Sequence, residues 1–204
     1  MRLFLAVAVS LACVASFAQE TRPQDSLDVD QIKVVAFDVF GTVFDFADAD
    51  RSQIGEYVEH VKSDTWQPLN VPQSWLAMPA HPDSAEGIKR LRRKFTVVTL
   101  SNGPVRLLTA MSKRAGVCWD AIVPIEMARV YKPNRDAYRV VMDLFHCRPS
   151  EVLMVTANPG FGDIKAAKEL GMQSIVIRPD GLRRERLNGP ADINELADLL
   201  GVTK

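Results

Sequence analysis

The sequence predicts an α/β protein with a doubly wound, parallel β-sheet covered by helices on both faces. From residue 83 onward, short apolar segments alternate with amphipathic ones, which is typical of such a sheet. The apolar run from Val34 to Phe37 ends in Asp38, and Gly41 and Thr42 follow in a turn. A buried parallel strand delivers an acid to its carboxyl end in this way. We therefore expect one domain with its site at the edge where the strands end.

The amino-terminal residues 1–18 have the pattern of a signal peptide. Arg2 provides a basic start, an apolar run extends from residue 3 to 17, and Ser16 and Ala18 are small residues before Gln19. The run is shorter than the ~20 residues of a membrane-spanning helix. We expect cleavage, export to the periplasm or the outside, and no stable membrane insertion, with an uncleaved anchor as the alternative. Residues 19–31 are polar and predict a linker to the domain at 32–204.

The composition argues against a nucleic-acid or anionic-membrane partner, because 25 basic residues balance 25 acidic ones. A small-molecule substrate is the expected ligand, and a homodimer stays possible. No Cys/His cluster in the sequence has the spacing of metal ligands. Cys118 and Cys147 could form a disulfide in an oxidising compartment or stay free.

An insert over about 46–82 separates the first strand, at 32–37, from the alternating region. Its first half carries Ile54, Tyr57 and Val61 at helical spacing, which predicts one amphipathic helix. Its second half is rich in proline and contains Trp66 and Trp75, which form either an aromatic lid or the packing of the insert.

The alternating region predicts the rest of the sheet and its helices. The expected strands are 95–100, 121–124, 152–156 and 174–178; the expected helices carry Ile88 and Leu91, then span 104–115, 133–145, 163–170 and 193–200.

Polar residues follow the second strand, where Ser101 and Asn102 precede Gly103 and Pro104. Proline suits the first turn of a helix, and glycine lets the backbone approach a ligand closely. Free N–H groups at this helix start, with the two polar side chains, predict a pocket for an anion. A plain helix N-cap is the alternative.

Lys132 precedes the next helix, where a cation is disfavoured by the helix dipole. We expect it to reach carboxylates at the sheet edge; a solvated lysine is the alternative. Tyr138 lies near the same end of that helix. Asn158 and Asp163 follow a further strand, and Asp163 is also a plausible N-cap. Successive strand ends thus bring these residues to one edge.

These residues resemble the haloacid dehalogenase superfamily of hydrolases, and within it the type II (S)-2-haloacid dehalogenases. The resemblance covers residues 34–200 apart from the insert and implies a Rossmann-like core with a helical cap, here reduced to the insert. The similar motifs are Phe37–Asp45, Leu100–Gly103, Val130–Pro133 with Tyr138, and a divergent fourth at 156–171.

The resemblance implies that Asp38 attacks the substrate and forms a covalent ester, which water then hydrolyses. Lys132 would hold the nucleophile ionised, and Thr42 would support its turn. Asn158 and Asp163 would orient the water and the lysine. In full, it assigns catalysis to Asp38, Thr42, Lys132, Asn158 and Asp163, and substrate binding to Phe40, Ser101, Asn102 and Tyr138.

One position separates the two main reactions of this superfamily. Phosphatases of the superfamily carry a second aspartate two residues after the nucleophile, where this chain has Phe40, which cannot transfer a proton. A halide leaves without an acid, so the resemblance favours dehalogenation with no cofactor. The alternatives are a phosphatase with Mg²⁺ at Asp38 and Asp163, and a non-catalytic exported binding protein.

The chain departs from the family pattern in three places. The insert is about half the length of the family's cap. Leu69 stands in the region where the family has a halide-binding arginine, and Arg51, the insert's one arginine, lies much closer to the nucleophile. Asn158 and Asp163 are two residues further apart than in the family. The short insert and the missing arginine motivate the binding-protein alternative.

Overall fold

The computed structural model describes residues 27–46, 49–63, 65–178 and 189–203, so the predicted signal peptide and most of the linker lie outside the described residues. Its centre is a five-stranded sheet in the order β3-β2-β1-β4-β5. Every pair of neighbouring strands is parallel, and β1 lies in the middle. The strands are β1 (Val34–Phe37), β2 (Thr96–Thr99), β3 (Ala121–Ile122), β4 (Val152–Thr156) and β5 (Gln173–Val176).

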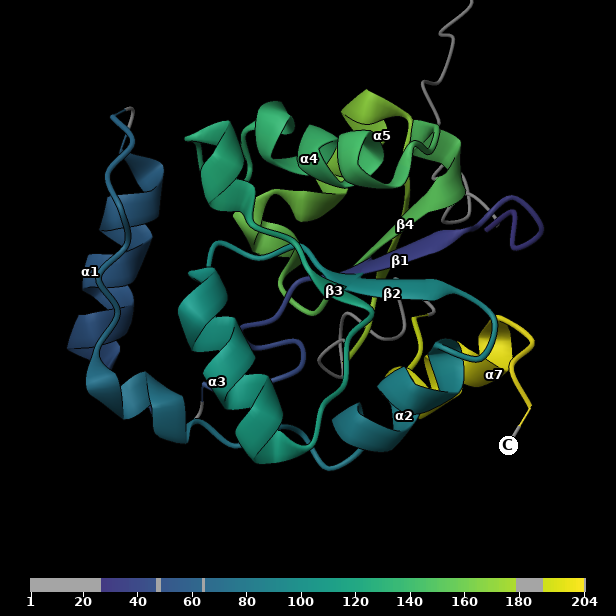
Figure 1. Ribbon diagram of the computed structural model, residues 1–204, viewed down its shortest axis with the longest axis horizontal. Coiled ribbons are helices and arrows are strands. Elements are labelled where there is room, and N and C mark those ends of the chain that lie inside the picture. Colours follow the sequence, from purple (N-terminus) through teal and green to yellow (C-terminus); the bar gives the residue numbers. More distant parts are fainter. Residues whose placement is uncertain (1–26, 47–48, 64, 179–188, 204) are drawn as a thin grey trace, which may run out of the picture.

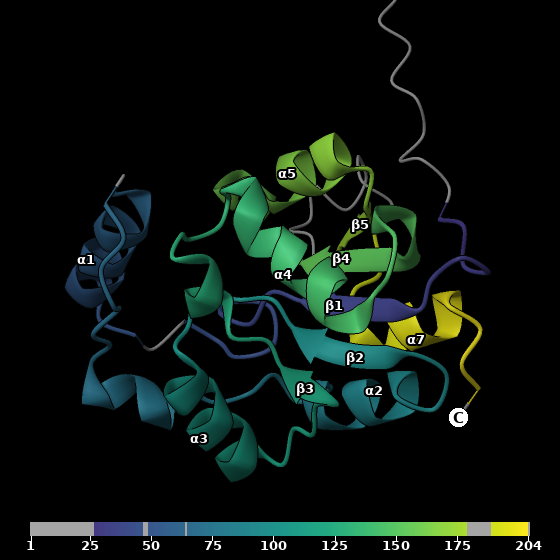
Figure 2. The ribbon, with the colours of Figure 1, turned by 45° about the horizontal axis from the view of Figure 1, so that its top comes forward.

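Helices cover both faces of this sheet (Figure 1). The pair α4 and α5 packs on one face, and α2, α3 and α7 pack on the other, as the turned view also shows (Figure 2). The predicted doubly wound fold is therefore confirmed. The helices are α1 (Arg51–Lys62), α2 (Ser84–Leu91), α3 (Val105–Ala115), α4 (Arg135–Phe145), α5 (Asp163–Leu170) and α7 (Ile193–Leu199).

The central strand β1 is buried on both faces. Val35 and Phe37 join the core under α2, α3 and α7, whereas Val34 and Ala36 join the core under α4 and α5. Burial on both sides explains why this strand is apolar throughout instead of alternating. Packing on both faces fixes the position of its carboxyl end, where Asp38 follows.

The insert contains α1, which lies beyond the carboxyl ends of the strands (Figure 1). The predicted apolar stripe faces the domain: Ile54 and Tyr57 pack against one core and Val61 against the other. None of the described helices is both long and apolar enough to cross a membrane.

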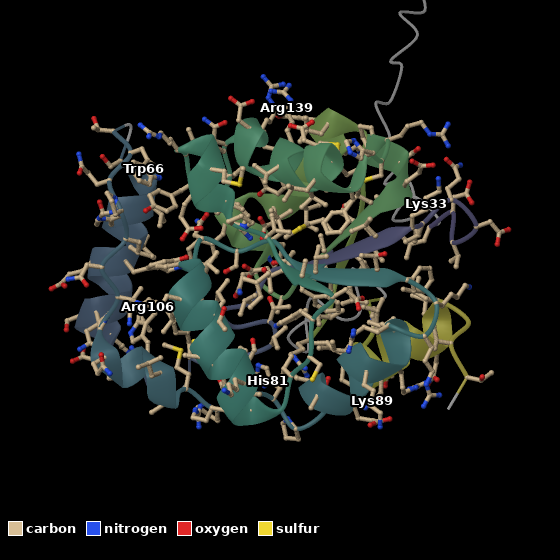
Figure 3. All side chains as sticks on the ribbon, viewed as in Figure 1. Lys33, Trp66, His81, Lys89, Arg106 and Arg139 are labelled. Atoms are coloured by element: carbon tan, nitrogen blue, oxygen red, sulfur yellow. The ribbon has the colours of Figure 1, made fainter. Side chains whose placement is uncertain are left out.

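An aromatic cluster joins the insert to the nucleophile turn. Trp75 is fully buried, and its ring centroid lies 5.3 Å from those of Phe40 and Phe46 and 5.2 Å from that of Tyr57. Trp75 therefore packs the insert and does not form a lid. Trp66 is half-buried beside α1 and stacks with Arg129, whose guanidinium carbon lies 5.9 Å from the ring centroid (Figure 3).

Two helical glycines predict opposite effects on stability. A Cβ on Gly87 would lie 2.7 Å from the Ile193 side chain, whereas a Cβ on Gly55 meets nothing within 4 Å. We expect Gly55→Ala to raise the free energy of unfolding by roughly 0.5–1 kcal/mol through helix propensity. Gly87→Ala should lower it by about 1–3 kcal/mol, because it forces α2 and α7 apart. Urea denaturation of both variants measures the difference, and stabilisation by Gly87→Ala would contradict the close packing of these helices.

Candidate active site

Asp38 lies at the carboxyl end of β1, and its backbone N–H donates to the Val155 carbonyl at 2.8 Å. Thr42 Oγ1 donates to Asp38 Oδ2 at 3.1 Å and accepts from the Ala157 N–H at 2.9 Å. The threonine thus ties the nucleophile turn to the end of β4 and fixes one carboxylate oxygen.

The turn after Asp38 requires glycine at Gly41. Its φ is +76°, in the left-handed region that disfavours other residues. A Cβ there would also lie 2.7 Å from Nδ2 of Asn158. Glycine therefore allows Asn158 to approach the turn, where its Nδ2 donates to the Phe40 carbonyl at 2.9 Å and lies 3.5 Å from Asp38 Oδ2.

Lys132 joins the two buried carboxylates of the site. Its Nζ lies 3.0 Å from Asp38 Oδ1 and 3.1 Å from Asp163 Oδ1. Lys132 is only 6% exposed, so the alternative of a solvated lysine is wrong. The alternative N-cap role of Asp163 is also wrong, because its side chain caps no helix and Gly162 is the N-cap residue.

Tyr138 holds the carboxylate of Asp163 in place by a hydrogen bond. Its hydroxyl donates to Asp163 Oδ1 at 2.5 Å, and the whole side chain is buried. Burial and the Asp163 charge raise the pKa of Tyr138 well above its usual range, so the phenol keeps its proton and stays a donor.

Burial and charge pull the pKa of the nucleophile in opposite directions. Burial raises the pKa of Asp38 above its ordinary value, and the nearby charge of Asp163 adds to the rise. Lys132 opposes this by its charge and its hydrogen bond. For Lys132 itself, burial alone would lower the pKa, but the carboxylates of Asp163 and Asp38 outweigh it and raise the pKa. The lysine therefore stays charged and favours an ionised nucleophile.

The two additional residues between Asn158 and Asp163 form part of a short 3₁₀ turn over Pro159–Phe161. Gly162, with φ +93°, then starts α5. The turn absorbs the extra length, so both polar residues still reach the nucleophile and the lysine. The departure from the family spacing therefore does not dismantle the site.

A cavity of about 570 Å³ opens over the nucleophile, between the ends of the strands and the insert. Among the predicted site residues, those on its wall are Asp38, Phe40, Asn102, Lys132, Asn158 and Asp163. The insert adds Ile54, Tyr57, Val58, Val61 and Lys62 from α1.

Thr42, Ser101 and Tyr138 lie behind this wall and are fully buried. The structure thus places Ser101 and Tyr138, both predicted to bind substrate, outside the cavity lining. Tyr138 supports the lining residue Asp163, whereas Ser101 Oγ accepts from the Gly103 N–H at 3.4 Å within its own turn.

At the start of α3, where an anion pocket was predicted, one N–H already has a partner from the protein. The Val105 N–H donates to Glu126 Oε1 at 3.1 Å. The Asn102 side chain pairs with the backbone of Lys132, donating to its carbonyl at 3.1 Å and accepting from its N–H at 2.7 Å. Glu126 lies on a turn that tertiary folding brings to this helix start, so the sequence pattern did not predict this contact.

The donor set does not fit a magnesium ion at the two carboxylates. Each oxygen of Asp38 and Asp163 already has an N–H or O–H partner, from Lys132, Thr42, Asn158 or Tyr138. Lys132 supplies the positive charge that a cation would bring. Within the described residues, no group of three or more His, Cys, Asp or Glu could hold a metal ion.

Sequence reasoning missed the contribution of α1 to the cavity. Tyr57 appeared only as one position of an apolar stripe, but it lines the cavity. Burial, together with the charge of Asp38, raises the pKa of Tyr57 well above its usual range, so the phenol is neutral. Lys62 also lines the cavity. A charged residue at the end of a helix did not predict this position.

A family model for haloacid dehalogenase-like hydrolases matches residues 48–171. The chain therefore belongs to this family of hydrolases, as the motifs predicted. It is 27% identical over 211 residues to the (S)-2-haloacid dehalogenase of Xanthobacter autotrophicus, covering 78% of this chain and 81% of that enzyme. It is 27% identical to (S)-2-haloacid dehalogenase 4A of Burkholderia cepacia, covering 62% of this chain and about half, 56%, of that enzyme.

One solved structure of similar fold comes from the same species as the first of these relatives. The structure of the L-2-haloacid dehalogenase from Xanthobacter autotrophicus with chloropropionic acid covalently bound matches with a TM-score of 0.64 and 23% identity. The match covers 85% of this chain and 100% of that one. At this identity the match shows a shared fold.

Replacing Lys132 tests the charge arrangement. Lys132→Met removes the cation that lowers the pKa of Asp38, so that pKa should rise further above its ordinary value. Since only the ionised carboxylate attacks, the acidic limb of the pH–rate profile should move to higher pH. Turnover should also fall by about 100-fold or more, because the attacking oxygen loses its orientation.

The matched control is Lys165→Met on α5, whose side chain is 82% exposed. It should keep the native rate and profile, with stability changed by about 0.5 kcal/mol or less. A Lys132→Met protein that folds by circular dichroism and keeps half of the native rate would remove Lys132 from the reaction.

Proposed function

We propose that this hydrolase cleaves the carbon–halogen bond of a small 2-haloacid through an ester on Asp38. The observation that carries this proposal is a carboxylate held by Lys132 and Thr42 on a cavity wall, with Phe40 where a proton donor would stand. The names of the enzymes similar to this chain support the same reaction.

In the first step, an Asp38 oxygen attacks C2 of the substrate and forms a C–O bond. The C–halogen bond breaks, and the halide leaves with the bonding pair, so no acid is needed. Lys132 stays protonated, because its pKa is raised. Thr42 and Asn158 hold the carboxylate by Oδ2 and limit its rotation.

In the second step, water attacks the carbonyl carbon of the ester. The Asp38–substrate bond breaks at that carbon, the 2-hydroxyacid leaves with the original Asp38 oxygen, and the remaining proton goes to solvent. Asn158 and Lys132 lie within reach of the carboxylate and can stabilise the oxyanion that develops there.

Halide release tests this proposal. The protein should release chloride from 2-chloropropionate equally with a chelator or with added Mg²⁺, and Asp38→Asn should abolish release because an amide is a poor nucleophile. In a single turnover in H₂¹⁸O, the product hydroxyl should be unlabelled and the label should enter Asp38. Absence of release from every small haloacid would contradict the proposal, and Mg²⁺-dependent hydrolysis of an aryl phosphate would favour the phosphatase.

We further propose that residues 1–18 direct export and are removed, on the basis of their basic start, apolar run and small residues. Expression of the full chain in a bacterium should give a mature protein that begins at Gln19 and is found outside the cytoplasm. Amino-terminal mass spectrometry after osmotic-shock fractionation measures both. An intact Met1 on protein recovered from the cytoplasmic fraction would contradict this.

A further inference from the structure

The halide that leaves in the proposed reaction, on which this inference rests, needs a partner on the far side of the substrate from Asp38. When Asp38 attacks C2, the reacting orbitals align only if the halide departs on the opposite side of that carbon. Asp38 lies at the ends of the strands, so the halide moves toward the insert, which forms the other side of the cavity (Figure 1). Lys132 and Asn158 contact the Asp38 carboxylate itself and therefore stay on the near side.

The insert brings no arginine to this side of the cavity. Arg51, its one arginine, starts α1 and is not among the residues that line the cavity. Leu69 stands in the region of the family's arginine, and it packs against the core under α4 and α5. Lys62 does line the cavity, but its side chain is 63% exposed, and a solvated ammonium stabilises a nearby anion only weakly. The donor for a halide must therefore be another residue of the insert.

Tyr57 on α1 presents a phenol to the cavity. Its ring centroid lies 5.9 Å from that of Phe40, two residues after the nucleophile, and 5.2 Å from that of the fully buried Trp75. These ring contacts hold the phenol on the cavity wall. It lies near enough to the nucleophile for the charge of Asp38 to raise the pKa of Tyr57.

The hydroxyl of Tyr57 is a neutral donor whose oxygen is already engaged. Burial and the Asp38 charge raise its pKa, so the phenol keeps its proton. A hydrogen bond with the Asn102 side chain works in the other direction and lowers the pKa, which means that the amide donates and the phenol oxygen accepts. The other amide hydrogen of Asn102 is bonded to the Lys132 carbonyl. The phenol proton is thus directed away from Asn102, toward an acceptor in the cavity.

We propose that Tyr57 binds the departing halide through its O–H, in place of the arginine that this chain lacks. As the C–O bond forms and the C–halogen bond breaks, negative charge moves from Asp38 to the halogen, where a positioned donor stabilises the transition state. The phenol keeps its proton, because a halide is a far weaker base than a phenolate, and the halide then leaves as a free anion. The competing explanation is that Tyr57 only packs the insert against Phe40 and Trp75.

The test removes one hydroxyl and varies the halogen. Tyr57→Phe keeps the ring beside Phe40 and Trp75 but has no donor. Ester formation is measured in single turnovers with 2-chloro-, 2-bromo- and 2-iodopropionate, because this step breaks the carbon–halogen bond. Tyr131→Phe is the matched control: it also removes a phenol that contacts the insert, where the hydroxyl donates to the Gln67 carbonyl at 2.6 Å, but Tyr131 does not line the cavity. Chloride binding to the same proteins is measured by chloride-ion NMR line broadening.

We expect Tyr57→Phe to slow ester formation from 2-chloropropionate about tenfold or more, which is the effect of one hydrogen bond to a charged group. The loss should be smaller for bromide and smallest for iodide, because larger halides accept hydrogen bonds more weakly. Chloride should bind several-fold more weakly to this variant. Any loss in Tyr131→Phe should be equal for all three substrates, with native chloride binding.

Equal losses for the three substrates in Tyr57→Phe would overturn the proposal and leave Tyr57 as a packing residue. A loss that depends on the halogen in Lys62→Gln and not in Tyr57→Phe would also overturn it, because the lysine would then bind the halide.

Chloride binding distinguishes failure of this inference from failure of the proposed function. If the native protein turns over no haloacid, but Tyr57→Phe weakens chloride binding and Tyr131→Phe does not, the reaction fails and the halide site stands. If chloride is released and Tyr57→Phe keeps the native rates and the native chloride binding, the halide site is refuted and the reaction stands.

Discussion

The contact on which the site depends is the Lys132 ammonium between the carboxylates of Asp38 and Asp163. Two buried carboxylates without a cation would cost several kcal/mol of desolvation and repulsion. The lysine offsets this cost and links three segments that are far apart in the sequence: the end of β1, the loop before α4 and the start of α5. The parallel topology serves this contact, because β1 and β4 are neighbours and end at the same edge.

The same contact determines the reactivity of the nucleophile. Burial raises the pKa of Asp38, while Lys132 works in the other direction. A carboxylate that is ionised but shielded from water is a better nucleophile than a solvated one, because fixed protein dipoles replace its hydration shell. Thr42 and Asn158 supply those dipoles at Oδ2, and the cavity brings a substrate to the same carboxylate. Stability and activity thus depend on one cation.

The sheet and the Lys132 contact could be predicted because their sequence signals are local. Apolar runs that end in polar residues indicate the strands, and a lysine at a helix start, where the dipole disfavours it, indicates a nearby carboxylate. It failed where a distant element decides the outcome. Glu126 accepts from the Val105 N–H at the start of α3, and no pattern near Asn102 predicts that contact. Ser101 and Tyr138 lie behind the cavity wall because side-chain direction depends on packing that a motif does not describe. The sequence did not predict that one side of α1 faces the cavity for a related reason. An apolar stripe predicts that a helix face is buried, but not which part of the protein covers it.

Phe40 connects two features of this chain: its short insert, and the absence of a proton donor two residues after the nucleophile. Its ring packs against Phe46, Tyr57 and Trp75, with centroids 5.3–5.9 Å apart, and this cluster joins the insert to the domain. Its carbonyl accepts from Asn158 at the nucleophile. An aspartate at this position would leave a charge among aromatic rings and remove the ring that they surround, at a cost of several kcal/mol. The residue that excludes acid catalysis therefore also packs the insert against the nucleophile turn and lines the cavity.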